Sequence, residues 1–272
     1  MSDIDAALAD RLPAPVLAVA VAIGLAALAF IVGNGAAALL AIALDSAGID
    51  ITPRRAVVLS VVTLQLVAFS AVSLGYLRYR DRTLADIGVE VPSLEGWISL
   101  GAGYVGMVVV WLVGAIGTFI IGNRLGIERQ QQGIIEIAQQ DPLIFLLIGV
   151  LSLFIVGPAE ELLFRGVIQT RLRETFGPVG GVGIATTLFA FAHITGFLPG
   201  SIGGALLSVS VLLLVGLVLG LVYEFTDNLV VVAAIHGLYN LTQATFGYLG
   251  VRFSDPEAAA VTLRTVAAIV GV

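Results

Sequence analysis

Residues 175–223, TFGPVGGVGIATTLFAFAHITGFLPGSIGGALLSVSVLLLVGLVLGLVY, form a run of 49 residues that contains no Asp, Glu, Lys or Arg. A bilayer core about 30 Å thick needs roughly 20 apolar residues in a helix, so this run is long enough to cross a membrane twice. Pro199 and its neighbouring glycines, in GFLPGSIGG at residues 196–204, would interrupt a helix near the middle of the run. The stretch therefore predicts two membrane-spanning helices with a break between them.

The rest of the chain repeats this pattern. Of its 272 residues, 58% are hydrophobic and only 12% are charged, and the mean hydropathy is +1.05, far outside the usual balance of soluble domains. We predict an all-α, polytopic transmembrane helical bundle of 7–8 spans, which forms a single integral membrane domain over residues 1–272 and lies in the cell membrane as a multi-pass protein. The seven clearest spans are residues 14–44, 56–77, 97–121, 143–164, 179–195, 203–223 and 229–250.

Three features of the spans and their connections need separate treatment. The apolar tail, residues 258–272, is a candidate eighth span that Arg264 weakens. The first charge-free run would be about 50 Å long as a helix, which implies either tilt or a break near residues 33–35. Residues 78–95 and 123–141 mix charged and apolar side chains, and we expect one or two interfacial helices there.

Composition also excludes several classes of function. The chain has no cysteine, so disulfides, thiolate nucleophiles and cysteine metal sites are absent. All 13 basic residues are arginines, and the net charge of −6 argues against a nucleic acid partner. No serine or threonine stands in an obvious nucleophile motif, which disfavours an acyl-enzyme mechanism.

A few ionisable side chains lie inside the apolar runs. Placing a charge at the centre of a bilayer costs about 2.5–3.5 kcal/mol on the insertion scale, so such groups should face one another and not lipid. They are Glu160, Glu161, Arg165 and both histidines of the chain, His193 and His236.

Helical spacing predicts how these groups are arranged. Residues four apart share a face of a helix, so Glu161 and Arg165 should form an ion pair, while Glu160 points elsewhere and keeps its carboxylate available. By the same rule His236 shares a face with Asn240, and His193 shares one with Phe189. The result is a small polar chamber with a base to activate water and donors to stabilise an oxyanion, as hydrolysis of a peptide bond requires.

Three motifs in this order resemble a known family. E-E-x-x-x-R (Glu160, Glu161, Arg165), F-x-x-x-H (Phe189, His193) and H-x-x-x-N (His236, Asn240) are similar to those of the CAAX protease and bacteriocin-processing (Abi) family of intramembrane endopeptidases, which includes the type II CAAX prenyl endopeptidase. The motif-bearing catalytic core covers about residues 142–250.

The resemblance implies a role for each residue and a class of substrate. Glu160 would activate the hydrolytic water with help from His193, and His236 and Asn240 would form the oxyanion hole. Glu161 and Arg165 would support the site together with Phe189. The implied partner is a membrane-associated peptide or protein, either a CAAX-type prenylated C-terminus or a leader peptide, and no cofactor is required.

Two other classes of function stay open at this point. Glu160, His193 and His236 are acceptable zinc ligands, so a zinc-dependent membrane metalloprotease is the first alternative, although the chain lacks an H-E-x-x-H helix. The second alternative is a non-proteolytic membrane scaffold or a transporter.

The arginines of the loops are nearly balanced between the two sides of the membrane, so they determine the topology only weakly. Arg171 and Arg173 follow Glu160 closely and favour a cytoplasmic position for that end of the span. We therefore expect the chamber to open at that end, on the cytoplasmic side.

Overall fold

The computed structural model describes residues 12–128, 130, 132–197 and 201–253. Within these ranges the chain is helical and contains no strand, which confirms the predicted fold class. The predicted eighth span, residues 258–272, lies outside the described residues. The helical stretches long and apolar enough to cross a membrane are Ala14–Ser46, Pro53–Tyr79, Leu94–Leu125, Leu143–Phe197, Ile202–Thr226 and Leu229–Phe253.

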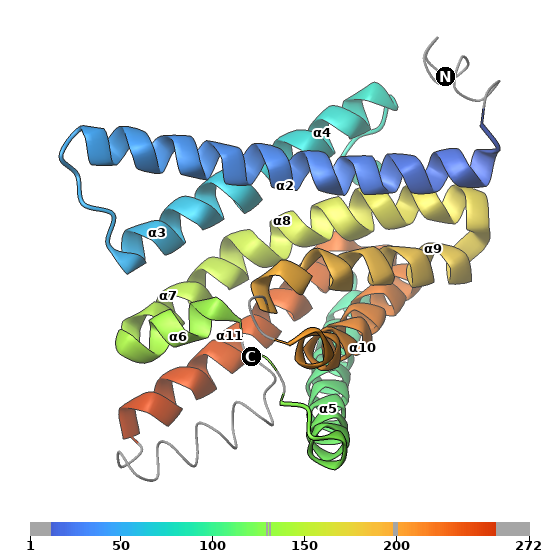
Figure 1. The fold of residues 1–272 in the computed structure, drawn as a ribbon. Helices are drawn as coiled ribbons and strands as arrows, with labels where there is room; N and C mark the ends of the chain where they lie inside the picture. Colours follow the sequence, from blue (N-terminus) through green and yellow to red (C-terminus); the bar gives the residue numbers. More distant parts are fainter. Residues whose placement is uncertain (1–11, 129, 131, 198–200, 254–272) are drawn as a thin grey trace.

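The fourth of these stretches holds two spans. Gly177, which Pro178 follows, has φ 71° and ψ −179°, a conformation that breaks the helix. The chain reverses there, so the part of α9 that follows Gly177 runs back alongside η4 (Leu162–Gln169) in the opposite direction (Figure 1). A Cβ added to Gly181 would lie 2.9 Å from the backbone of Arg173, which shows how closely the two arms meet. The six candidate stretches, with the fourth divided at Gly177, are thus roughly consistent with the 7–8 spans that the sequence predicts.

The first span is one unbroken helix, α2 (Ala14–Ser46), so the alternative of a break near residues 33–35 is wrong. Asn34 remains helical and its side-chain amide donates to the Phe30 carbonyl oxygen, 2.8 Å away. Gly33 serves a close helix contact, because a Cβ there would lie 2.7 Å from the Cα of Leu64. Leu64 belongs to the second span, which is built from α3 (Pro53–Ser60), η1 (Val61–Phe69, a π-helical segment) and α4 (Ser70–Tyr79).

The second half of the chain builds the centre of the bundle around one long, modified helix. That helix consists of α7 (Leu143–Leu151), η3 (Ser152–Val156), α8 (Gly157–Glu161) and η4 (Leu162–Gln169), and it continues into α9 (Thr170–Ala192). The short η5 (Ile194–Phe197) then leads to α10 (Ile202–Thr226) and α11 (Leu229–Phe253), which pack together with α5 (Leu94–Leu125). The predicted break near residues 196–204 is confirmed by the gap between α9 and α10.

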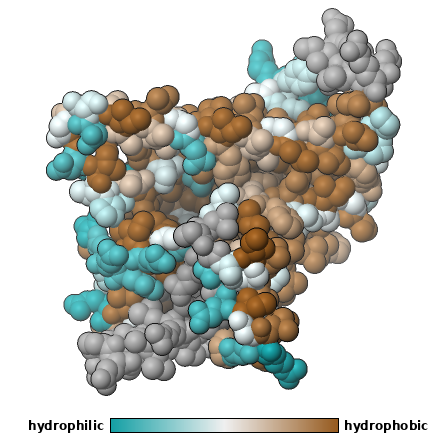
Figure 2. Space-filling view, in the orientation of Figure 1, coloured by the Kyte–Doolittle hydropathy of each residue, from teal (hydrophilic) through white to brown (hydrophobic). Residues whose placement is uncertain are grey.

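The outer surface is suited to lipid. Hydrophobic residues cover much of the face shown in Figure 2, and large apolar side chains such as Ile31, Leu39 and Val113 are more than half exposed. In water such a surface would be strongly unfavourable, whereas lipid tails solvate it. The chain is therefore a multi-pass integral membrane protein.

The two mixed connections each carry one short helix. Residues 78–95 contain η2 (Ala85–Ile87), and residues 123–141 contain α6 (Gly133–Gln140). The end of the second connection is tied to α3, because Arg54 Nη2 donates to Asp141 Oδ1 over 2.8 Å. The Arg54 guanidinium holds the pKa of the Asp141 carboxyl below its usual value.

Candidate active site

Glu160 and Glu161 lie on α8, a short α-helical turn between the π-helical segments η3 and η4. Such π segments are rare and often occur at functional sites. Gly157 lets this turn approach α11, because a Cβ added there would lie only 3.0 Å from the Ala233 carbonyl oxygen. The close contact brings both carboxylates next to His236 on α11.

Glu161 connects two of the predicted residues. Its Oε2 lies 3.3 Å from Arg165 Nε, which confirms the ion pair that their spacing predicts. The N–H of Arg165 is not directed at that oxygen, so the contact is an ion pair without a hydrogen bond. The other carboxylate oxygen, Oε1, lies 2.7 Å from His236 Nδ1. Glu161 therefore holds the His236 ring as well as the arginine, a contact that spacing within one helix could not predict.

Arg165 is fully buried and is held by two other elements. Its Nη2 donates to the carbonyl oxygen of Gly216 on α10 over 3.1 Å, and its guanidinium carbon lies 4.8 Å from the centre of the Phe189 ring. A Cβ at Gly216 would lie 3.1 Å from that ring, so glycine provides the close contact between α9 and α10. Phe189 thus packs beneath the charged pair as well as beside His193, whose ring centre is 4.7 Å from its own.

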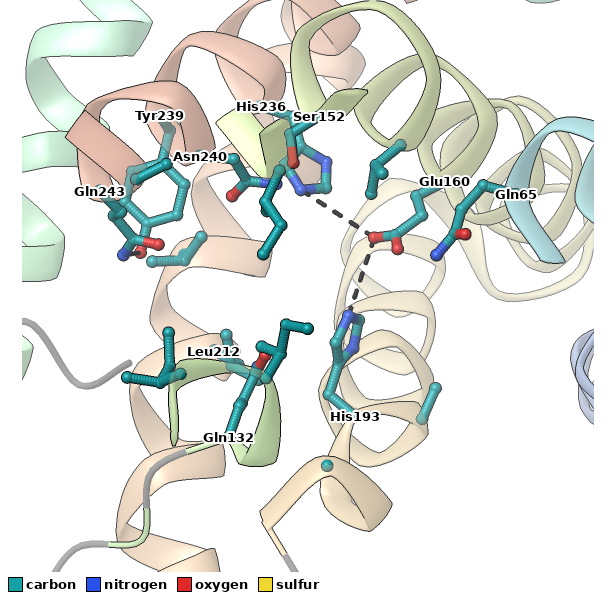
Figure 3. Close-up of a pocket in the computed structure, with 18 of the residues that line it drawn as sticks. Gln65, Gln132, Ser152, Glu160, His193, Leu212, His236, Tyr239, Asn240 and Gln243 are labelled. Carbon is teal, nitrogen blue, oxygen red and sulfur yellow. Dashed lines mark hydrogen bonds and ion pairs between the residues drawn. The ribbon is translucent and has the colours of Figure 1, made fainter. Parts of the chain in front are cut away.

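Glu160 faces both histidines (Figure 3). Its Oε2 lies 3.7 Å from His193 Nε2 and 4.0 Å from His236 Nε2, so two imidazoles from two other helices face one carboxylate oxygen. The Glu160 side chain is 7% exposed and His193 is 24% exposed. The predicted clustering of Glu160, His193 and His236 is therefore present in the structure.

The hydrogen bond at Nδ1 of each histidine determines whether its Nε2, the atom that faces Glu160, carries a proton or a lone pair. His193 Nδ1 lies 2.8 Å from the Phe189 carbonyl oxygen, which can only accept, so Nδ1 carries a proton. His236 Nδ1 carries one for the same reason, since it faces the Glu161 carboxylate. A neutral ring then presents a lone pair at Nε2, and the gap to the Glu160 carboxylate suits a water molecule that donates to both acceptors.

These groups open into a cavity of about 370 Å³. Asn240 lines it together with Glu160 and both histidines, so all four residues predicted to act chemically share one chamber (Figure 3). Much of the remaining wall is apolar, as in typical ligand sites. The other polar residues of the wall, which spacing did not connect with the site, are Gln65, Gln132, Gln139, Ser152, Thr195, Tyr239 and Gln243.

The cavity extends away from Arg171 and Arg173, contrary to the expectation that it opens beside them. Along α7 and α8 it is lined by residues from Phe145 to Glu160, and along α11 by residues from His236 to Gly247. Both helices thus border it toward the end of the bundle that holds α6. The expectation failed because loop charge carries no information about which end of a span the helices leave open.

The donor set does not fit a metal ion as it stands. Among the described residues, no group of three or more His, Asp and Glu side chains is arranged to hold one. His236 directs Nδ1 to Glu161, and Nε2 of both histidines lies 3.7–4.0 Å from the same carboxylate oxygen. Zinc ligation by Glu160, His193 and His236 would therefore require these side chains to move.

The fold and the site define a polytopic membrane protein with a buried carboxylate and two imidazoles around a chamber between its helices. Residues 142–242 match the family model of the type II CAAX prenyl endopeptidases described as Rce1-like, and this range includes every motif residue named above. The match confirms the resemblance that the three motifs predict, to a family of membrane endopeptidases. No curated protein and no solved structure matched the chain.

Proposed function

We propose that this protein is an intramembrane endopeptidase in which Glu160 activates a water molecule for attack on a peptide bond. The observation that carries the proposal is the focus of His193 Nε2 and His236 Nε2 on one oxygen of Glu160 inside the cavity. A carboxylate in such a place can take a proton from water, and no covalent intermediate is needed.

The proposed hydrolysis needs only water and side chains of this protein, without a cofactor. Water gives one proton to Glu160, with His193 helping to hold the molecule, and its oxygen bonds to the carbonyl carbon. His236 and Asn240 donate to the oxygen that becomes negative. The carbon–nitrogen bond then breaks, and the proton held by Glu160 passes to the leaving amine. A neutral His236 offers no proton at Nε2, so we propose that it acts as imidazolium, whose charge the Glu161 carboxylate stabilises.

The lining of the cavity supports a membrane-associated substrate. Apolar side chains from several spans, among them Phe30, Leu64 and Leu212, form much of its wall beside the polar groups. A prenylated CAAX-type C-terminus and a hydrophobic leader peptide both combine an apolar segment with a peptide bond, so both are proposed substrates.

The test is cleavage of prenylated and unprenylated fluorogenic peptides by purified protein and by a Glu160→Gln variant. We expect the substitution to lower kcat by about 100-fold or more, because general-base catalysis contributes on the order of 10²–10⁴. Glu95→Gln is the matched control, since Glu95 is exposed near the start of α5 and should leave cleavage unchanged. Cleavage that survives Glu160→Gln would reject the proposal, and loss of cleavage with a strong chelator would favour the zinc alternative.

A further inference from the structure

Gln65 comes from outside the matched segment and nevertheless lines the cavity. It lies on η1, the π-helical part of the second span, which packs against α8. Figure 3 shows its carboxamide beside Glu160, with the amide nitrogen directed toward that carboxylate. Spacing alone assigns an isolated Gln in a span to helix packing, because such side chains commonly bond between helices.

The side chain has an unpaired acceptor. Its Oε1 is buried and has no hydrogen-bond partner among the residues that the structure describes. Buried polar atoms are almost always paired, so an exception calls for an explanation. A purely apolar side chain of the same length would fill the same space without that cost.

The chemistry of Glu160 supplies an explanation. A carboxylate only accepts hydrogen bonds, so a carboxamide that serves it must turn its N–H₂ group toward it. In Gln65 this orientation directs Oε1 to the other side, where the described part of the chain provides no donor. An unpaired oxygen on that side is what a carboxamide with its donor aimed at Glu160 would show. The opposite amide orientation would place two acceptors against each other.

We propose that Gln65 is a positioning residue that donates through Nε2 to the Glu160 carboxylate in the working enzyme and fixes its orientation toward the two histidines. Hydrogen bonds of this kind are often long in the free enzyme and shorten when substrate binds. This proposal rests on the proposed function of Glu160. The motif residues of the site all lie in the second half of the chain, and Gln65 would be a functional residue from the first half.

Two variants separate the possible roles of Gln65. Gln65→Met keeps the length and packing of the side chain but removes the donor and the acceptor. Gln65→Glu keeps an acceptor and replaces the donor with a second negative charge. We expect both to lower kcat by about 10- to 100-fold with KM unchanged, because misplacement of a reacting group by 1 Å can cost about that much. A wild-type kcat for Gln65→Met would show that Gln65 serves only in helix packing. A wild-type kcat for Gln65→Glu would show that its acceptor, and not its donor, is the functional group.

The matched control is Thr63→Val on the same π-helical segment. The Thr63 hydroxyl donates to the Leu59 carbonyl oxygen within its own span and does not line the cavity, so kcat should not change. If Glu160→Gln retains cleavage, the proposed function fails. If Glu160→Gln is inactive and Gln65→Met is fully active, only the proposal for Gln65 fails.

A second measurement does not depend on activity. The thermal midpoints of wild type, Gln65→Met, Glu160→Gln and the double variant form a cycle that isolates the interaction between the two side chains. We expect the two single shifts in Tm not to add, since Gln65→Met removes the donor and Glu160→Gln removes the negative charge that this donor would serve. Strictly additive shifts would show that the two residues do not interact and would overturn the proposal.

Discussion

Glu161 links the structural and chemical parts of the site at the scale of single residues. One of its oxygens faces the buried Arg165 and the other faces His236 Nδ1. Removing the carboxylate leaves the arginine charge without its partner, which costs about 3–5 kcal/mol at a buried pair. It also withdraws the negative charge that, in the proposed mechanism, stabilises a protonated His236 ring. One substitution therefore has two consequences that need separate measurements.

The first prediction separates them with a compensating variant. Glu161→Gln should lower both Tm and kcat, whereas Glu161→Gln combined with Arg165→Met should recover most of the Tm, because it removes the uncompensated charge. The double variant should still cleave at least about 10-fold more slowly than wild type, since the group that orients and charges the imidazole is absent. Peptide cleavage and thermal unfolding in detergent measure the two effects. Wild-type kcat in the double variant would mean that Glu161 serves only Arg165.

The sequence predicts more of the site within single helices than between them. Helical periodicity predicts the pair of Glu161 and Arg165, and this pair is present although Arg165 lies within the π-helical segment η4. The bond from His236 to Glu161 and the position of Gln65 depend on how separate spans pack, which no spacing in the sequence encodes. Gln65 gave a signal as a carboxamide in an apolar run, but that signal does not distinguish packing from function.

At the scale of elements, close contacts at glycines determine where α8 and α11 meet. A Cβ added to Gly237 would lie 2.8 Å from the Cα of Leu153 on η3, the segment that leads directly into α8 with its two carboxylates. Gly250, on the same helix α11, has no atom of the described residues within 4 Å of the corresponding position. The sequence identifies both as helical glycines and cannot tell which of them lies in a contact.

The second prediction compares these two glycines. Gly237→Ala should lower Tm by several degrees, because forcing extra atoms into a packed contact costs about 1–3 kcal/mol. It should also lower kcat, since the adjacent residue is His236. Gly250→Ala should leave kcat unchanged and keep or raise Tm, because alanine is favoured over glycine in a helix by about 0.5–1 kcal/mol. Thermal unfolding and cleavage of the same peptide provide both readouts. Equal effects of the two substitutions would contradict the role given to the close contact.

At the scale of the whole molecule, the fold was the most predictable property and the direction of the cavity the least. The charge-free apolar runs and their lengths determine the approximate number of spans, because the bilayer requires about 20 residues for each crossing. The cavity depends on where α6, α7 and α11 leave space between them, which is a property of packing. The loop arginines indicate only which side of the membrane each end of the bundle faces. Arg173 therefore could not show at which end the chamber opens.

The last prediction concerns the two ends of the bundle. Glu136, on α6, lies at the end of the bundle toward which the cavity extends. Arg173 lies at the opposite end, beyond η4 of the long helix that begins with α7. Both side chains are exposed. The chain has no cysteine, so Glu136→Cys and Arg173→Cys each introduce a single thiol. An impermeant thiol reagent applied to intact cells should label one variant, and the other only after permeabilisation, because a full membrane span separates the two positions. Labelling of Glu136→Cys in intact cells would place the cavity mouth outside, and labelling of Arg173→Cys would place it in the cytoplasm. Labelling of both from one side would contradict the crossing of the membrane between them.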